Sequence, residues 1–420
     1  MKKHVTNIPK RRFKGFTDAW EQRKLGDVLR FQNGFNGGRE AYGAGTAFIS
    51  VMDILNNQFI TYDCIRGKAT VTDDEIERFS VRYGDVLFQR SSENVEDAGT
   101  SNVYVDNDKT AIFGGFVIRG RQIAPYSPRF MKYLLDTKTI RKQITKKAQG
   151  AQHVNVSQET LQDIQITLPN QREQEAIENC LCNLDNLIIL HQRKCDSLKQ
   201  VKKYMLQKMF PKQGEKVPEI RFAGFTGDWE QRKLGDIGET YTGLSGKTKE
   251  DFGHGDARFV TYMNVFSNPV ADKDKVEAVE IDYSQNEVQY GDVFFTTSSE
   301  TPEEVGMSSV WLESMENTYL NSFCFGYRPK TVINPYFMAY VLRSDEVRAK
   351  IIFLAQGISR YNISKNKVME IEILFPDIKE QKKIGTYFFT LDNLITLHQR
   401  KSDSLKEIKK FMLQNMFPNK

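Results

Sequence analysis

One stretch of the chain occurs twice in nearly the same form. Residues 185–199 read DNLIILHQRKCDSLK and residues 392–406 read DNLITLHQRKSDSLK, an offset of 207 residues from Asp185 to Asp392. The offset is close to half of the 420 residues, so it indicates a duplicated domain rather than a solenoid with repeats of about 20–50 residues. Any fold of this chain must therefore contain two homologous halves.

The composition is that of a soluble globular protein, with 40% hydrophobic and 27% charged residues. Five cysteines without the spacing of a disulfide framework favour a reducing, cytoplasmic location. No run of about 18 apolar residues predicts a membrane span, and the basic start of the chain lacks the apolar stretch of a signal peptide. A net charge of +5 is compatible with nucleic-acid binding without requiring it.

Each half opens with an apolar segment and continues as a strand-rich region. Trp20 and Trp229 occupy matching positions in the opening segments, where they are expected to anchor each core. Residues 46–54 and 258–265 are rich in β-branched and aromatic side chains and are interpreted as strands. Two globular, strand-containing domains are therefore predicted.

A helix is expected to begin at a proline in each half. Ser127 or Asn334 takes the N-cap position, and Pro128 or Pro335 follows at the first helical position. The sequence from Asn334 is also similar to the Asn-Pro-Pro-Tyr/Phe motif of amino-methyltransferases. The second proline is missing, however, and the first copy reads Ser-Pro-Arg-Phe, so helix capping explains both copies and catalysis explains neither.

Two polar segments in each half are candidate DNA contacts. The first follows a Gly-Asp turn and a short apolar strand, and the second keeps the frame Gln-Gly-x-x-x-x-Asn-x-Ser around residues that differ between the copies. Hydroxyl, amide and guanidinium groups suit phosphates and base edges, although a solvated turn is an open alternative for the first segment. The candidates are Arg90, Ser91, Ser92, Gln149, Gln152, His153 and Asn155 in the first half, and Thr297, Ser298, Ser299, Gln356, Ser359, Arg360 and Asn362 in the second.

A half-buried strand and a long helix follow in each half. The alternation of Ile164, Ile166 and Leu168 predicts the strand, which a proline ends. Long helices are expected from about Gln171 and Asp377. The first helix would run for 39 residues as far as Met209, or roughly 58 Å at about 1.5 Å per residue.

The long helices carry a heptad seam, so we expect them to pack on each other as an antiparallel, coiled-coil-like pair. The positions of this seam include Leu184, Ile188, His191 and Leu198, with Leu391, Ile395, His398 and Leu405. The repeated histidines are interpreted as register-setting seam residues rather than as a pH switch or metal site. No metal site is predicted at His153 either, because no second His or Cys lies at ligand spacing and the other copy has Arg360.

The order of these motifs resembles the specificity subunit of type I restriction–modification systems. It is carried by the Leu-Pro end of each domain, the helix starts EQEAI (residues 173–177) and EQKKI (residues 380–384), and the Leu-Asp-x-Leu-Ile helices; it covers essentially the whole chain, twice. The second copy departs slightly, with Leu-Phe-Pro before its helix.

The resemblance implies two target-recognition domains, each reading one half of a split, asymmetric site in double-stranded DNA. It also implies two helices that act as a spacer and as the dock for two methyltransferase subunits, which makes the eight seam positions named above the candidate spacer and docking residues. Restriction (translocase and nuclease) subunits would join the complex. S-adenosylmethionine, ATP and Mg²⁺ would then serve the partner subunits, and this chain would bind no cofactor.

The expected fold class is α+β, with two homologous mixed α/β target-recognition domains related by a pseudo-two-fold. The expected boundaries are residues 1–170 for the first recognition domain, 171–214 for the central helix, 215–376 for the second recognition domain and 377–420 for the C-terminal helix.

The chain carries no motif that predicts catalysis. It has no Gly-rich cofactor loop in a strand–turn–helix context, no Walker A motif, no acidic nuclease cluster and no nucleophile–His pair. The pair of glycines between Phe113 and Phe116 lacks that context as well. The alternative functions are a helix-pair scaffold that tethers partners without sequence-specific DNA binding and, less favoured by these motifs, a stand-alone modifying enzyme.

Overall fold

The computed structural model describes residues 7–148, 150 and 153–418. Two compact units divide the chain: Met1–His191 with Arg400–Lys420, and Gln192–Gln399. The division shows that the ends of the chain contribute to one unit and its middle forms the other.

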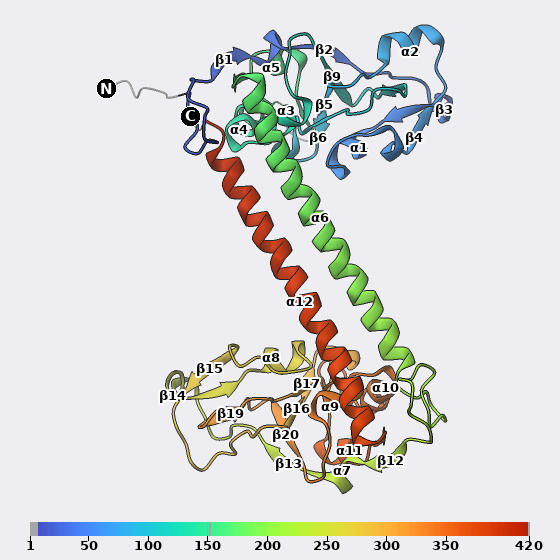
Figure 1. The fold of residues 1–420 in the computed structure, drawn as a ribbon, viewed down its shortest axis with the longest axis vertical. Coiled ribbons are helices and arrows are strands. Elements are labelled where there is room, and N and C mark those ends of the chain that lie inside the picture. Colours follow the sequence, from blue (N-terminus) through green and yellow to red (C-terminus); the bar gives the residue numbers. More distant parts are fainter. Residues whose placement is uncertain (1–6, 149, 151–152, 419–420) are drawn as a thin grey trace. The chain divides into compact units, whose positions relative to one another are not determined.

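Each unit consists of a globular domain and parts of two long helices, α6 (Gln171–Lys208) and α12 (Ile378–Asn415), drawn in green and red in Figure 1. Both helices have 38 residues, or about 57 Å. The first unit therefore combines two separate stretches of the chain, whereas the second is one continuous stretch, and each unit contains parts of both long helices.

The first domain is built on a four-stranded antiparallel sheet in the order β2-β9-β5-β7 and a three-stranded sheet β4-β3-β8 in which β3 and β8 are parallel. Its strands are β1 (Glu21–Lys24), β2 (Leu29–Asn33), β3 (Tyr42–Ile49), β4 (Gly67–Ala69), β5 (Val86–Gln89), β6 (Ser91–Ser92), β7 (Ser101–Val103), β8 (Ala111–Phe113), β9 (Val117–Gln122), β10 (Val154–Asn155) and β11 (Gln165–Leu168). Its helices are α1 (Val51–Asn56), α2 (Asp73–Phe79), α3 (Pro128–Leu135), α4 (Lys138–Lys147) and α5 (Gln158–Gln162).

The second domain repeats this topology, with sheets β13-β20-β16-β18 and β15-β14-β19. Its strands are β12 (Glu230–Lys233), β13 (Gly238–Thr242), β14 (Phe252–Val260), β15 (Val276–Val279), β16 (Val293–Thr296), β17 (Ser298–Ser299), β18 (Ser308–Val310), β19 (Thr318–Leu320), β20 (Cys324–Pro329), β21 (Tyr361–Asn362) and β22 (Glu372–Phe375). Its helices are α7 (Leu234–Ile237), α8 (Tyr262–Ser267), α9 (Pro335–Val341), α10 (Asp345–Phe353) and α11 (Lys365–Met369). The prediction of two homologous mixed domains is confirmed.

The strand prediction for residues 46–54 and 258–265 was wrong for the last residues of each range, which are helical. Strands β3 and β14 end at Ile49 and Val260, and the helices α1 and α8 follow. Ser50 starts α1 through a capping box with Asp53. In the second domain Thr261 caps the start of α8. Capping thus outweighs the strand preference of the apolar residues, because it satisfies backbone N–H groups at the helix start.

The opening segment of each domain pairs with the strand that leaves it. β1 runs antiparallel to β11, and β12 runs antiparallel to β22. Trp20 and Trp229 precede these strands and are buried, which confirms them as core anchors. Both ends of each domain are therefore joined beside the start of its long helix.

The core of each domain is completed by residues that follow the opposite long helix in the same unit. Phe417 lies 6.0 Å from Trp20 and 5.6 Å from Phe130, between ring centroids, in the first unit. Phe210, which is 207 residues earlier, packs on Trp229 and Phe337 in the second unit. The end of the chain is therefore a part of the first domain's core.

The long helices begin and end where local signals place them. The side chain of Asn170 accepts a hydrogen bond from the N–H of Glu173 (3.0 Å), and that of Asp377 accepts one from the N–H of Glu380 (3.0 Å). Pro211 follows the first helix within three residues and stops its continuation. The expected starts near Gln171 and Asp377 are confirmed.

The two proline-led helices also form as predicted. Asn334 caps α9 by accepting a hydrogen bond from the N–H of Phe337 (3.0 Å). Ser127 precedes α3 without a side-chain cap, because its hydroxyl accepts a hydrogen bond from the Gln171 amide (3.1 Å) instead. Among the described residues, no helix combines the length and apolar character that a membrane crossing requires.

Candidate nucleic-acid interface

The two polar segments of the first domain lie side by side, although more than 60 residues separate them in the sequence. β6 and β10 form a two-stranded antiparallel ladder in which Ser91 lies opposite Asn155. The Ser91 hydroxyl is hydrogen-bonded to the Asn155 side chain, and the Arg90 carbonyl accepts a hydrogen bond from the N–H of Val156 (2.9 Å). Arg90, Ser91 and Asn155 are thus brought to one surface.

The second domain builds the same surface with different side chains. β17 and β21 pair so that Ser298 lies opposite Asn362. Asn362 also exchanges two backbone hydrogen bonds with Gln356, at 2.8 and 3.0 Å, which closes the Gln-Gly segment into a hairpin. The Thr297 carbonyl accepts a hydrogen bond from the N–H of Ile363 (3.0 Å). Tyr361 and Asn362 form the ladder strand, and Ile358, Ser359 and Arg360 form the turn of the hairpin.

The candidate DNA contacts differ in exposure. The exposed ones are Arg90, His153, Asn155, Gln356, Ser359, Arg360 and Asn362, and the half-exposed ones are Ser91 and Thr297. The buried ones are Ser92, Ser298 and Ser299. Ser92 receives a hydrogen bond from the N–H of Asn94 (3.1 Å), so its hydroxyl supports the turn. Gln149 and Gln152 lie outside the described residues.

A third segment meets this surface in both domains, and the sequence reasoning missed it. The Phe116 carbonyl accepts a hydrogen bond from the N–H of Arg90 (2.9 Å), and the Phe323 carbonyl accepts one from the N–H of Thr297 (2.9 Å). Both phenylalanine side chains are exposed. The signal that could have found them is the phenylalanine kept in both copies at the 207-residue offset, while the residues before it differ.

The helix α8 is tied to the polar ladder of the second domain. The Tyr262 hydroxyl donates a hydrogen bond to the Ser298 carbonyl (2.6 Å). Burial raises the pKa of Tyr262, so the hydroxyl keeps the proton that this bond uses. This contact fixes the first turn of α8 against the polar ladder.

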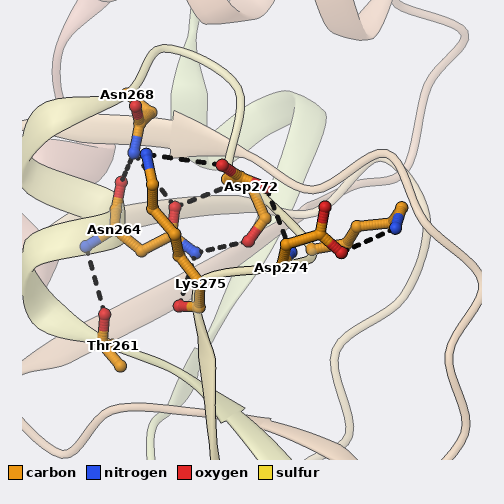
Figure 2. A network of polar contacts seen from close by, with 7 residues as sticks. Thr261, Asn264, Asn268, Asp272, Asp274 and Lys275 are labelled. Carbon is orange, nitrogen blue, oxygen red and sulfur yellow. Dashed lines mark hydrogen bonds and ion pairs between the residues drawn. The ribbon is translucent and has the colours of Figure 1, made fainter. Parts of the chain in front are cut away.

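A polar network behind α8 holds that helix in place (Figure 2). The buried side chain of Asn264 donates to the carbonyls of Asp272 (2.8 Å) and Lys275 (3.0 Å) and accepts from the N–H of Asp272 (2.9 Å). Asn268 donates to the Asn264 carbonyl (2.9 Å). The network connects the helix to the loop after it, and every one of these bonds is intradomain.

Arg343 completes this support from the other end of α8. Its guanidinium donates 3.0 Å hydrogen bonds to the carbonyls of Val265, Phe266 and Asn268, which are otherwise free at a helix C-terminus. Burial lowers the pKa of Arg343 to about 10, so it is still protonated at neutral pH. A buried cation at the negative end of the helix stabilises α8.

The long helices pack antiparallel within each unit. In the first unit Lys409 of α12 contacts Asp185 of α6 (2.6 Å), and in the second unit Lys202 of α6 contacts Asp392 of α12 (2.6 Å). In the second unit the Cys195 thiol also lies 3.6 Å from the Gln399 side chain, so residue numbers rise along α6 as they fall along α12. The candidate docking residues are buried (Leu391, Leu405) or half-buried (Leu184, Ile188, His191, Leu198, Ile395, His398).

Other apolar residues of the helix pair are more exposed than those seam positions. In the first unit they are Leu187, Leu190, Ile408 and Phe411, and in the second they are Leu394, Leu397, Val201 and Tyr204. Each residue of the first set corresponds to one of the second at the 207-residue offset. Exposed apolar residues that recur in this way are typical of an interaction surface.

Comparison with known proteins agrees with this architecture. The model of the type I restriction modification DNA specificity domain matches residues 17–200 and again residues 226–407. The chain belongs to this family. DNA sequence recognition for a type I restriction–modification system is therefore its function, and the specificity subunit is a non-catalytic component of such systems. No comparison supports a tether without DNA recognition.

Two specificity subunits of Methanocaldococcus jannaschii are similar to this family member. The type I restriction enzyme specificity subunit MjaX is 24% identical over an alignment of 437 residues, which covers 99% of this chain and 96% of that protein. The subunit MjaVIII is 22% identical over 304 residues, which cover 65% of each protein. The similarity to MjaX therefore includes both copies of the specificity domain.

A solved structure shows the same fold. The type I restriction–modification S subunit from M. genitalium superposes with a TM-score of 0.57 at 16% identity and covers 98% of this chain and 100% of its own. This similarity supports the fold class of two homologous domains joined by long helices.

Proposed function

We propose that each domain of this specificity subunit reads one half of a split, asymmetric site in double-stranded DNA. The observation that carries the proposal is the paired polar ladder, built in both domains with the same backbone pairing and with different side chains beside it. The first presents Arg90 and His153, and the second presents Thr297 and Arg360. Arginine and asparagine pair with guanine and adenine edges in the major groove, so different sets select different bases.

The proposal includes two methyltransferase subunits as partners. It is supported by the exposed apolar residues of the helix pair, which recur once in each unit; Leu190 and Leu397 are both 60% exposed. A surface present twice suits two copies of the same partner. Restriction subunits join this complex, and S-adenosylmethionine, ATP and Mg²⁺ serve the partners, since the proposed role of this chain is recognition.

A swap of one domain tests the independent reading of two half-sites. Residues 28–170 are replaced by the matching domain of another family member, and the modified motif is determined by methylome sequencing of cells that carry the complex. We expect one half of the motif to change and the other half and the gap to stay the same. A change in both halves would contradict independent reading.

The helix pair is proposed to set the gap between the half-sites. Its length of about 57 Å exceeds one turn of DNA, which is about 34–36 Å. One helical turn inserted into both helices, after Lys199 and after Lys406, is expected to lengthen the gap in the methylated motif. An active complex with an unchanged gap would rule out this role.

A further inference from the structure

The phenylalanine beside each polar ladder is exposed and is not part of the core of its domain. Phe116 is 70% exposed and Phe323 is 56% exposed. The backbone carbonyl of each phenylalanine accepts a hydrogen bond from the polar segment of its domain. Each ring therefore lies next to the side chains proposed to read DNA. A large apolar side chain in such a place contributes little to folding, because burial is what stabilises it.

An exposed methionine accompanies the phenylalanine in each domain. Met52 on α1 is 59% exposed, and Met263 on α8 is 60% exposed. These residues correspond, because β3 and β14 align Ile49 with Val260 through their parallel partners β8 and β19. The same pair of residue types, phenylalanine and methionine, is therefore presented by both domains.

In the first domain the two side chains line one open groove of about 610 Å³. Tyr42, Phe48 and Arg39 line it as well. The Arg90 guanidinium reaches the Gly115 carbonyl (3.4 Å), which adjoins the groove. The groove is thus continuous with the polar ladder and joins an apolar surface to hydrogen-bonding groups.

Close backbone packing fixes the turn that carries each phenylalanine. A Cβ atom on Gly34 would lie 2.0 Å from the Gly114 carbonyl oxygen, and one on Gly243 would lie 2.2 Å from the Asn321 carbonyl oxygen. Only glycine allows this approach. The turn is therefore held against its neighbour in both domains, and the ring that follows it is presented from a rigid support.

We infer that Phe116 with Met52, and Phe323 with Met263, contact thymine C5-methyl groups in the major groove, one half-site for each domain. The inference rests on the proposed reading of DNA. The thymine methyl is the apolar group that the base pairs expose in that groove, and it is the natural contact for an apolar residue placed among hydrogen-bonding side chains. Each phenylalanine and methionine pair therefore favours A·T base pairs through a contact to the thymine methyl group, which the polar ladder does not make.

The test uses the complex of this chain with its methyltransferase subunits and duplexes that contain the methylome-defined site. Each thymine is replaced in turn by deoxyuridine, which lacks only the methyl group. We expect at least one replacement in each half-site to raise Kd about fourfold, the change expected for losing the burial of one methyl group.

The variant Phe116→Ala is expected to abolish the deoxyuridine effect in one half-site and to leave the effect in the other half-site unchanged. Phe323→Ala should do the reverse, so each domain is the matched control for the other. Phe116→Leu keeps an apolar contact and should retain the effect. Tyr283→Ala removes another exposed aromatic side chain and should change neither half-site.

The outcomes separate this inference from the proposed function. If the wild-type complex does not distinguish its site from a scrambled duplex, the proposed function fails, and the methyl contact fails with it. If the complex binds its site specifically and no deoxyuridine replacement weakens binding, or Phe116→Ala leaves the effect intact, only the methyl contact is overturned.

Discussion

Lys202 of α6 and Asp392 of α12 form an ion pair at 2.6 Å, and Asp392 also accepts a hydrogen bond from the Tyr340 hydroxyl (2.8 Å). The same carboxylate therefore joins the opposite helix to the domain. In the first unit Asp185 has the corresponding role, with Lys409 at 2.6 Å and Tyr133 at 2.7 Å. Each unit thus fixes its own domain to its own part of the helix pair.

Asp392→Ala is expected to lower the free energy of unfolding of the second unit by about 1–3 kcal/mol, because Lys202 and Tyr340 lose a charged partner. Urea denaturation measures the loss. Asp196→Ala, an exposed position of α6, is the control and should stay within about 0.5 kcal/mol. An equal loss in both variants would show that the ion pair has no special role.

Arg221→Ala is expected to destabilise the second unit by about 3–5 kcal/mol, because the Glu380 carboxylate is 0% exposed and would lose a bidentate partner. Arg232→Ala breaks an exposed ion pair of β12 and should cost less than about 1 kcal/mol. Thermal denaturation of both variants compares the two. Similar melting temperatures for the two variants would show that the buried ion pair contributes no more to stability than the exposed one.

Phe417→Ala is expected to destabilise the first unit by about 3–5 kcal/mol, since its ring completes the core around Trp20 and Phe130. Phe210→Ala should do the same in the second unit. Limited proteolysis with mass spectrometry identifies the unit that opens first. Cleavage in the same unit for both variants would contradict the separate completion of the two cores.

Arg360→Ala is expected to relax the specificity of the complex at one position of one half-site, with a loss of about 1–3 kcal/mol against the preferred base. Binding to duplexes with single base changes measures this loss at fixed salt. The half-buried Arg328 side chain is unsuitable as a control because it is paired to Asp292 (2.7 Å), so the control is Lys203→Ala at an exposed position of α6. Uniform weakening at every position would indicate a phosphate contact instead.

Leu190→Glu is expected to remove one of two methyltransferase subunits from the complex, and Leu397→Glu the other, because a charge would be placed in an exposed apolar contact. Mass photometry of the assembled complex counts the subunits. Gln200→Glu, an exposed polar position of α6, is the control and should leave both partners bound. A full complex with both leucines replaced would place the docking surface elsewhere.

The duplication, the domain number and the long helices follow from the sequence alone. The caps at Asn170 and Asp377, the proline at 211 and the heptad seam act within a few residues of the positions they determine. Such local interactions leave periodic patterns in a sequence, and a second copy of the pattern separates them from chance. The error at residues 46–54 arose where a capping box competed with the strand preference of apolar residues.

The tertiary structure decided which polar residues share a surface. β6 meets β10 only because the sheets of the domain bring them together, and no local pattern records a pairing across more than 60 residues. Packing also buried Ser92, Ser298 and Ser299 and left Phe116 exposed, which residue type alone does not determine. Finally, Phe417 packs on Trp20 because α12 lies against α6 within the first unit. That contact depends on the tertiary structure rather than on a local sequence pattern.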